Sequence, residues 1–204
     1  MDDFERLAQW RSGDAAAGNL LFERHFESVY RFFRHKVGAD ALDLVQKTFL
    51  VCVESRDRFR AQSSFRTYLF AIARNQLFAY WRAAARAPDL DEGSTSLHEL
   101  SPSPSAIALK RDEDRRLLEA LRTIPIELQV ILELFYWEDL SGAEVAEVLG
   151  VPEGTARSRL RRAREALAER LHALEPMGDL PATATDLDTW AESLRRLGVE
   201  LLQD

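Results

Sequence analysis

The sequence has little of what non-helical folds require. Its 204 residues include only nine Gly, seven Pro and one Cys, so an internal disulfide framework is excluded. Apolar residues recur every three or four positions, and no segment shows the strict alternation of a half-buried strand. The sequence therefore predicts an all-α protein of one or two domains, and a hydrophobic content of 46% is sufficient for a core.

Targeting and catalytic signatures are also scarce. The start MDDFERL is acidic, unlike a signal peptide, and no apolar run approaches the ~20 residues that span a membrane. We therefore expect a cytoplasmic protein without membrane insertion. The four histidines are far apart, and HExxH, a phosphate-binding glycine loop and a nucleophile elbow are all missing. The prediction is a protein that is not an enzyme and has no catalytic site, metal or cofactor.

Charge is distributed unevenly along a chain whose net charge is −7. Residues 54–86 contain seven Arg and two acids, and residues 153–172 contain six Arg and three acids. Residues 87–109 contain four acids and neither Lys nor Arg, and residues 173–204 contain seven acids and two Arg. This pattern indicates two nucleic-acid contacts in a protein whose other parts repel DNA.

Residues 141–167, SGAEVAEVLGVPEGTARSRLRRAREAL, predict two helices joined by a tight turn. Ser141 and Glu144 have the spacing of a capping box, which starts the first helix. Gly150 suits the left-handed residue that ends this helix, and Pro152 suits the opening of the next one. The pattern is typical of a helix-turn-helix, whose second helix enters the major groove.

The second of these helices is basic. We expect a buried stripe on one side and, on the other, an outward row of Arg157, Arg161 and Arg164 flanked by Ser158, Arg159 and Arg162. Guanidinium groups bind phosphates and guanine edges. Our hypothesis assigns base reading to Arg157, Ser158, Arg161 and Arg162, and phosphate contacts to Arg159 and Arg164. The alternative is a solvated basic helix.

The N-terminal part predicts a short helix, a loose joint at residues 12–19 and a long helix that ends near Gly38. Asp40 is expected to cap a further helix. In that helix the inward side chains are expected to be Leu42, Val45, Phe49, Cys52 and Val53, and the outward ones Asp43, Gln46, Lys47 and Leu50.

A polar segment at residues 57–65 precedes a helix expected from about residue 67 to residue 82. This helix interleaves basic and aromatic side chains, a pattern that suits single-stranded DNA because cations follow phosphates while rings receive unstacked bases. Phe65, Tyr68 and Trp81 could equally belong to the core.

Three segments resemble the extracytoplasmic-function (ECF) group of the bacterial sigma-70 family of RNA polymerase sigma factors. The helix-turn-helix is similar to the family pattern LSxxEIAxxLGVxxGTVxSRLxRARxxL, with Ala156 in place of Val. DLVQKTFL at residues 43–50 resembles DLVQETFL, with Lys47 in place of Glu, and residues 59–82 resemble the segment that melts and reads the minus-ten element. The resemblance covers about residues 20–172.

The resemblance implies two partners, core RNA polymerase and promoter DNA, and leaves room for an anti-sigma factor. It implies that Asp43, Gln46 and Phe49 bind core polymerase and that the helix-turn-helix binds the minus-thirty-five element. It further implies that the loop from Arg60 to Ser64 holds a flipped, single-stranded base. The candidates for that contact are Arg60, Gln62, Ser63, Ser64, Arg74 and Asn75.

The domain organisation follows from the same segments. We expect a region 2-like domain at residues 1–86, a flexible acidic Ser/Pro linker at 87–109 and a region 4-like domain at 110–174, followed by an extension at 175–204. In the region 4-like domain, two helices are expected to meet at Pro125. The linker either imitates phosphate in the polymerase channel or acts as an inert spacer.

The extension predicts an amphipathic helix. Its apolar seam repeats at spacings of 3, 4, 3 and 4 and consists of Leu187, Trp190, Leu194, Leu197 and Leu201. Such a seam must dock on the chain's own domains, on a partner or on a second copy. One hypothesis is a regulatory tail that restrains a DNA-binding domain; the other is an accessory helix that covers a core.

The rival function is a repressor or response-regulator output domain, which also uses a helix-turn-helix but binds duplex DNA without core polymerase. The two-body layout disfavours it, because such a protein does not require the DLVQKTFL segment or the basic, aromatic unit at residues 59–82.

Overall fold

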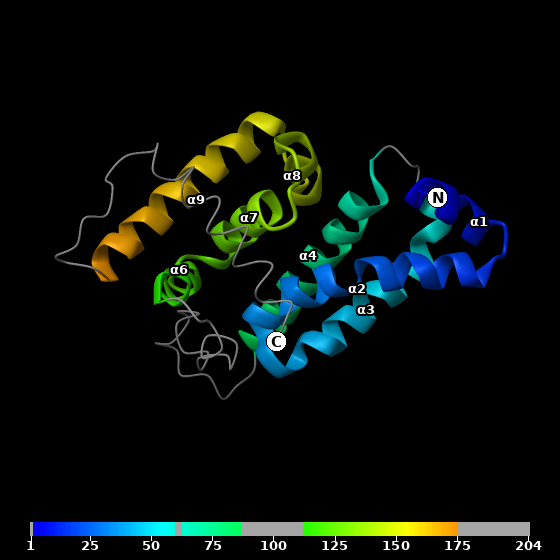
Figure 1. Ribbon diagram of the computed structural model, residues 1–204, viewed down its shortest axis with the longest axis horizontal. Helices are drawn as coiled ribbons and strands as arrows, with labels where there is room; N and C mark the ends of the chain where they lie inside the picture. Colours follow the sequence, from blue (N-terminus) through cyan, green and yellow to red (C-terminus); the bar gives the residue numbers. More distant parts are fainter. Residues whose placement is uncertain (1, 60–62, 87–111, 175–204) are drawn as a thin grey trace. The chain divides into compact units, whose positions relative to one another are not determined.

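The computed structural model describes residues 2–59, 63–86 and 112–174, and within these ranges the secondary structure is helical, with no strand (Figure 1). The helices are α1 (Asp3–Arg11), α2 (Ala15–Val37), α3 (Ala41–Ser55), α4 (Phe65–Ala84), α6 (Asp112–Thr123), α7 (Ile126–Tyr136), α8 (Gly142–Leu149) and α9 (Glu153–Leu174), with short 3-10 turns η1 (Gly38–Asp40) and η2 (Arg56–Arg58). The predicted all-α class is confirmed. No helix in these ranges has the length and apolarity to cross a membrane.

The chain divides into two compact units, one built on α1 to α4 and the other on α6, α7 and α9. The predicted linker at 87–109 and the predicted tail at 175–204 lie outside the described residues, as do Arg60 and Gln62.

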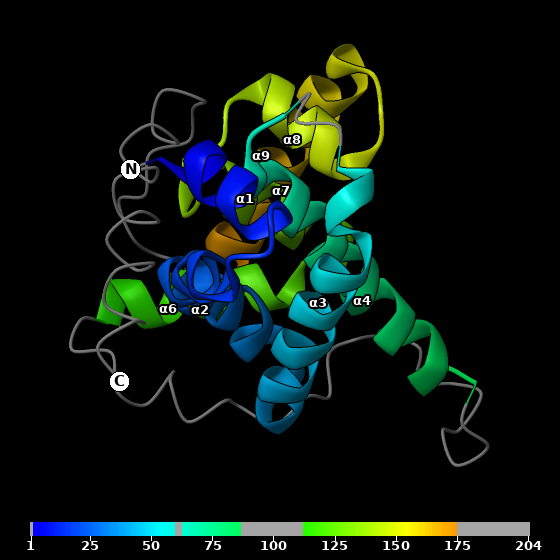
Figure 2. The same ribbon diagram turned by 90° about the vertical axis from the view of Figure 1, so that its right-hand side faces the viewer.

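Helices α2, α3 and α4 of the N-terminal unit lie side by side, and α1 packs on the first part of α2 (Figure 2). The rings of Phe32 and Phe70 meet edge to face with centroids 5.7 Å apart. The largest fully buried side chains of this unit are Phe32, Phe33, Phe65, Phe70, Leu21, Leu44, Leu69 and Leu77. Phe65 is thus a core residue. Of the two alternatives left open for this ring, core packing holds and base stacking does not.

The joint between α1 and α2 is a tight turn rather than the loose segment that we predicted. Asp14 caps α2, and its carboxylate accepts a hydrogen bond from the Ala16 amide at 2.9 Å. Gly18 lies inside α2 beneath the indole of Trp10, and a Cβ atom there would lie 2.6 Å from Trp10 Nε1. The prediction failed because the alanines after Asp14, which we assigned to a linker, form the first turn of α2, and Trp10 packs on Gly18 of the same helix.

The start of α3 also differs from the prediction. Asp40 makes no side-chain capping hydrogen bond to α3. Its carboxylate instead accepts a hydrogen bond from the Tyr80 hydroxyl at 2.7 Å, which ties the corner between α2 and α3 to α4. Burial, reinforced by Asp40, raises the pKa of Tyr80 to about 12, so the phenol remains a donor.

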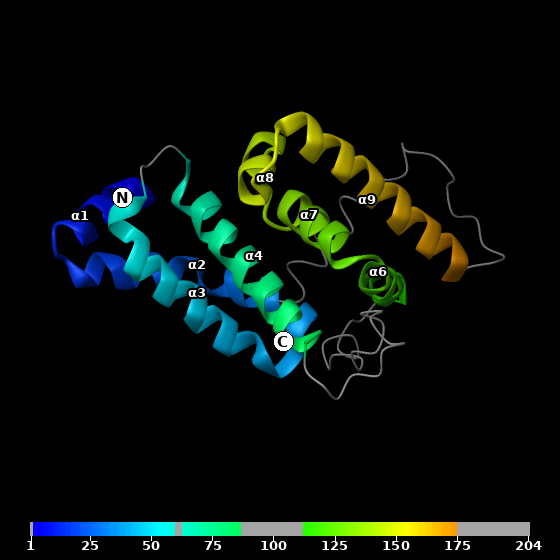
Figure 3. The same ribbon diagram turned by 180° about the vertical axis from the view of Figure 1, so that it is seen from behind.

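In the C-terminal unit, α6 and α7 both pack on α9 (Figure 3). The predicted break at Pro125 is confirmed, since α6 ends at Thr123 and α7 begins at Ile126. Gln129 is buried, and its Nε2 donates to the Ile124 carbonyl at 2.8 Å, which satisfies a backbone acceptor freed at the break.

Candidate promoter and polymerase interfaces

The helix-turn-helix has the predicted local geometry. The Ser141 amide donates to Glu144 Oε2 at 2.9 Å and the Glu144 amide donates to Ser141 Oγ at 3.3 Å, so the capping box is present. Gly150 has the left-handed φ of 64° that ends α8. The Pro152 carbonyl then accepts from the Ala156 amide at 3.0 Å in the first turn of α9.

Helix α9 has one buried side, formed by Ala156, Leu160, Ala163, Leu167 and Leu171. On the other side Arg157, Ser158, Arg159, Arg161 and Arg162 are exposed. Arg157 pairs with Glu153 at 2.9 Å, and Arg161 pairs with Glu165 at 2.8 Å. These arginine side chains remain 79% and 71% exposed. Exposed i,i+4 ion pairs are weak, so both guanidinium groups are available to exchange their acids for DNA.

Arg164 departs from the predicted outward row. It is half-buried, and its guanidinium lies 5.4 Å from the ring centre of Phe135 and 5.5 Å from that of Tyr136. The physical reason is helical geometry, because Arg164 lies one turn after buried Leu160 and therefore borders the apolar stripe. Its contact with α7 holds α9 on the rest of the unit.

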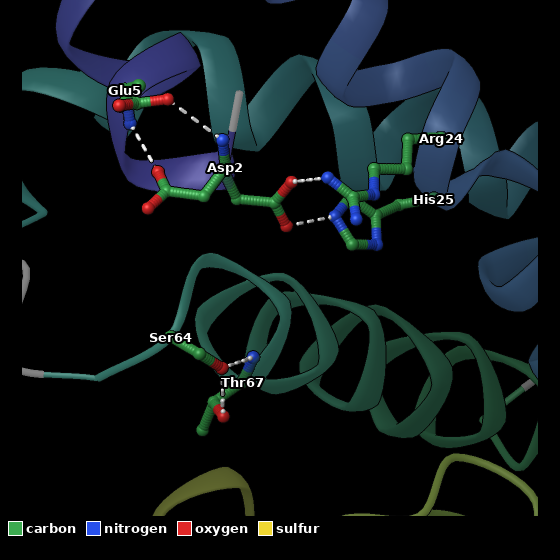
Figure 4. A network of polar contacts seen from close by, with 7 residues as sticks. Asp2, Glu5, Arg24, His25, Ser64 and Thr67 are labelled. Carbon is green, nitrogen blue, oxygen red and sulfur yellow. Dashed lines mark hydrogen bonds and ion pairs between the residues drawn. The ribbon is translucent and has the colours of Figure 1, made fainter.

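The start of α4 is fixed by Ser64, which caps the helix. The Ser64 hydroxyl accepts from the Thr67 amide at 3.0 Å and lies 2.7 Å from the Thr67 hydroxyl (Figure 4). On the other side of residues 60–62, Phe59 is buried and stacks on Tyr68 with ring centres 4.4 Å apart. Ser63 and Ser64 are both half-buried, and the Ser64 carbonyl accepts from the amide of Tyr68 at 3.1 Å.

A polar network beside α4 was not predicted. The Asp3 carboxylate lies 2.9 Å from Arg24 Nη1 and 2.6 Å from His25 Nε2. Figure 4 shows the Arg24 and His25 side chains next to each other and pointing the same way. The His25 ring is 5.5 Å from that of Phe65. Burial lowers the pKa of His25, although the hydrogen bond to Asp3 acts in the opposite direction. The network joins α1 and α2 near the start of α4.

The candidate DNA-contacting residues of α4 lie next to one another. Arg74 is half-buried, with its guanidinium 4.9 Å from the ring centre of Phe78. Its Nη1 also donates to Asn75 Oδ1 at 3.4 Å. Asn75 is exposed. The helix thus presents a polar amide beside an arginine that is already braced by an aromatic ring.

The sidedness of α3 differs from the prediction at two positions. Leu42 and Val53, expected to point inward, are 52% and 40% exposed. Buried instead are Leu44 and Thr48, and the Thr48 hydroxyl donates to the Leu44 carbonyl at 2.7 Å. This hydrogen bond satisfies the hydroxyl, so a residue read as polar can occupy the core.

The exposed side of α3 carries an apolar stripe, which we define as Leu42, Leu50 and Val53, with Gln46 between them. Asp43 is exposed beside it and pairs with Lys47 at 2.6 Å. Phe49 is half-buried, with its ring 4.6 Å from that of Phe22. The spacing of 4, 4 and 3 from position 42 to position 53 was the signal that could have revealed this stripe.

Comparisons with known families agree with this arrangement. Residues 21–87 match Sigma-70 region 2, and residues 114–167 match Sigma-70, region 4. The chain is 31% identical over 175 residues to the ECF RNA polymerase sigma-E factors of Salmonella typhimurium (strain LT2) and Escherichia coli (strain K12), which covers 80% of this chain and 91% of theirs. It is also 31% identical to the Haemophilus influenzae factor of that name over 182 residues, 83% of this chain and 94% of that protein.

Two solved structures have the same fold. CnrH, in complex with the cytosolic domain of CnrY, aligns with a TM-score of 0.62 at 24% identity over 84% of this chain and 97% of that chain. RpoE of Bartonella quintana, in complex with the anti-sigma factor NepR, aligns with a TM-score of 0.59 at 23% identity over 75% and 95%.

A helix-turn-helix unit and a separate four-helix unit, each matched by its own sigma region, define a sigma-70 family protein. Within that family the identity to the sigma-E factors is decisive: the chain belongs to the ECF group of RNA polymerase sigma factors. The family is one of transcription initiation factors, so the repressor alternative is not favoured.

Proposed function

We propose that the chain binds core RNA polymerase, directs it to specific promoters and has no turnover of its own. The observation that supports this proposal most strongly is that Sigma-70 regions 2 and 4 occur in order on one chain. Each region has an exposed surface suited to binding polymerase or DNA. We further propose that it acts in the cytoplasm and that its domains have the predicted boundaries, with the 87–109 linker between them. Assembly with purified core enzyme, followed by footprinting on promoter DNA, tests the proposal.

For polymerase docking we propose the exposed side of α3, with Asp43, Gln46 and Phe49 joined by the apolar stripe. An apolar stripe beside an exposed amide and carboxylate suits a protein interface, because burying the leucines supplies affinity while the polar groups set orientation. Leu42→Ser with Leu50→Ser should weaken core binding about tenfold, or about 1.4 kcal/mol.

The control for this test is Phe4→Ser, which changes an apolar residue of α1 that is 45% exposed. It should leave core binding unchanged. Equal losses in both variants, or none in either, would remove α3 from the interface.

For the minus-ten element we propose a single-strand contact by Ser63, Ser64, Arg74 and Asn75, with Arg60 and Gln62 from outside the described residues. Polar groups in front of α4 suit a flipped base, whose extrusion costs a few kcal/mol that hydrogen bonds must offset. Asn75→Ala is the cleanest probe because Asn75 is exposed, whereas Ser64 caps the helix. It should weaken binding of a single-stranded minus-ten oligonucleotide to the holoenzyme.

For the minus-thirty-five element we propose that Arg157, Ser158, Arg161 and Arg162 read bases while Arg159 and Arg164 contact phosphates. The exposure of the first four supports the base-reading role. The half-burial of Arg164 makes its phosphate contact the least supported of the six.

We propose that access to these surfaces is restrained either by an anti-sigma factor or by the C-terminal tail. The support for the tail is its acidic, amphipathic sequence at residues 185–201, which lies outside the described residues. Deletion of residues 176–204 should raise promoter-directed activity, and Trp190→Ala with Leu194→Ala should do the same. Unchanged or lower activity in a folded truncation would leave an anti-sigma factor or an accessory helix.

A further inference from the structure

Arg11, the last residue of α1, holds the backbone that leads into residues 60–62. Its Nε and Nη2 atoms donate to the Arg56 carbonyl at 3.0 and 2.7 Å. Nη2 also donates to the Phe59 carbonyl. The guanidinium carbon lies 5.8 Å from the centre of the Phe59 ring. One side chain thus bridges the carbonyl of the first residue of η2 and that of the residue directly after η2, which are 45 and 48 residues away in sequence.

The Arg56 carbonyl needs a donor. Carbonyls in the last turn of a helix have no partner within it, and Arg56 directly follows α3. The planar guanidinium presents several N–H groups in a fixed fork and can serve two acceptors at once. A lysine ammonium is a point charge on a flexible stem and does not reproduce this geometry. The contact is therefore specific to arginine rather than to positive charge.

Arg11 is itself held by its neighbours. Trp10 is buried, and the guanidinium carbon of Arg56 lies 5.5 Å from its ring centre. Trp10 packs on Gly18 of α2, so the end of α1 cannot shift without disturbing α2. On the far side, Phe59 stacks on Tyr68 of α4. These contacts join α1, η2 and α4.

We propose that Arg11 is a positioning residue for single-stranded promoter DNA. By fixing the Arg56 and Phe59 carbonyls, it holds Phe59 in its stack with Tyr68 and so keeps the start of α4, with Ser63 and Ser64, in one geometry. A site that is already held in its bound conformation binds more tightly. The inference rests on the proposed minus-ten contact. It adds α1, which precedes the matched residues 21–87, to the determinants of that contact.

The alternative role for Arg11 is a direct contact with a DNA phosphate. The two roles differ in whether lysine can replace Arg11 and in the salt dependence of binding. A phosphate contact tolerates lysine, and its loss lowers the slope of log K against log salt by roughly 0.7 for a single strand. A positioning residue does not tolerate lysine and leaves the salt slope unchanged, because the phosphates remain bound by other groups.

The test compares Arg11→Lys and Arg11→Met with Arg24→Lys in the full chain assembled with core polymerase. Arg24 is the matched control, because it is also basic and also joins α1 to α2, through Asp3. Affinity for a fluorescent single-stranded minus-ten oligonucleotide is measured across a salt series. Hydrogen exchange of the free protein is followed at the amides of residues 56–59 and 63–64.

We expect Arg11→Lys to bind the oligonucleotide about tenfold more weakly, or about 1.4 kcal/mol, with an unchanged salt slope. Exchange should accelerate at residues 56–59 and 63–64 only, core affinity should be unchanged, and Arg24→Lys should behave like wild type. Arg11→Lys alone decides the question if Arg11→Met fails to fold.

Wild-type affinity in Arg11→Lys, or a loss accompanied by a lower salt slope, overturns the proposal. A wild-type holoenzyme that does not bind the oligonucleotide overturns the proposed minus-ten contact itself, a result distinct from a failure confined to Arg11. Unchanged exchange at residues 56–59 in Arg11→Lys would show that these carbonyls do not depend on the fork.

Discussion

Helices α4 and α9 both carry arginines with a partner four residues away, but the partners differ in kind. On α4, Arg66 and Arg74 lie over the rings of Phe70 and Phe78, with the guanidinium carbons 5.9 and 4.9 Å from the ring centres. On α9, the partners are the acids Glu153 and Glu165. The same helical spacing thus braces the arginines of one unit and leaves those of the other loosely paired.

This difference suits two kinds of DNA recognition. A duplex offers fixed base edges in a groove, so exposed side chains that exchange a weak acid partner for DNA are sufficient. A single strand offers no such frame, and the protein must supply a rigid surface for the unstacked bases. In the N-terminal unit, we expect this rigidity to come from the ring contacts of Arg66 and Arg74 on α4 and from the hydrogen bonds of Arg11 to the Arg56 and Phe59 carbonyls.

Removing an aromatic support should have the largest effect. Phe70 is fully buried, so Phe70→Ala should lower the free energy of unfolding by about 3–5 kcal/mol. Cys52 is a built-in reporter for this unit, because burial raises the pKa of its thiol to about 12 and the chain has no other cysteine. Labelling of Cys52 by a thiol reagent should accelerate in Phe70→Ala and remain slow in wild type.

The control for Phe70→Ala is Leu50→Ala, which changes an exposed residue of α3 and should alter stability by no more than about 0.5 kcal/mol. A loss below about 1 kcal/mol in Phe70→Ala would show that the aromatic frame is not what holds the N-terminal unit together.

Replacing an exposed arginine of α9 should affect DNA binding and not folding. Arg162→Ala should weaken holoenzyme binding by about 1–3 kcal/mol and relax selectivity at one base pair. Arg159→Ala, as a phosphate contact, should weaken all upstream sequences alike and lower the salt slope by about 0.9. Binding to a library of upstream elements distinguishes the two, and uniform weakening by Arg162→Ala would refute its base-reading role.

Arg164 should behave like the arginines of α4, although it belongs to α9. Its guanidinium lies against two rings of α7, so Arg164→Met should destabilise the C-terminal unit by about 0.5–1 kcal/mol in chemical denaturation. Arg161→Met is the matched change at an exposed position and should be neutral for stability. Equal stabilities would mean that the ring contacts of Arg164 contribute nothing.

Releasing the arginines of α9 from their acids should have the smallest effect. Glu165→Gln removes the partner of Arg161, and because exposed pairs contribute only about 0–1 kcal/mol, stability should barely change. Duplex affinity at low salt should rise slightly, since one competing carboxylate is lost. A clear loss of affinity would indicate that Glu165 holds Arg161 in its DNA-binding position.

The sequence was sufficient where structure is set locally. The capping box at Ser141, the left-handed Gly150 and the break at Pro125 depend on neighbours within a few residues, and all three predictions are confirmed. The sidedness of α9 was predicted except at Arg164, which borders the apolar stripe.

Two of the failures involve partners that are distant in sequence. Asp40 was predicted to cap α3 from its position before the helix. Its carboxylate instead accepts from Tyr80, forty residues away, and local sequence spacing does not reveal such a distant partner. The segment at residues 12–19 was predicted to be a loose joint because local helix propensity does not take account of the packing of Trp10 on Gly18. For the same reason, local spacing did not indicate the contacts of Arg11 with the Arg56 and Phe59 carbonyls or those of Asp3 with Arg24 and His25. The site assignments on α3, α4 and α9 remain predictions.

The most direct test of the central claim is run-off transcription with purified core RNA polymerase and a promoter library. If the chain is an ECF sigma factor with two DNA interfaces, discrete transcripts should appear only when chain and core enzyme are both present, and they should require both promoter elements. Absence of any core-dependent transcript, or specific promoter binding by the chain that core polymerase does not alter, would contradict the account.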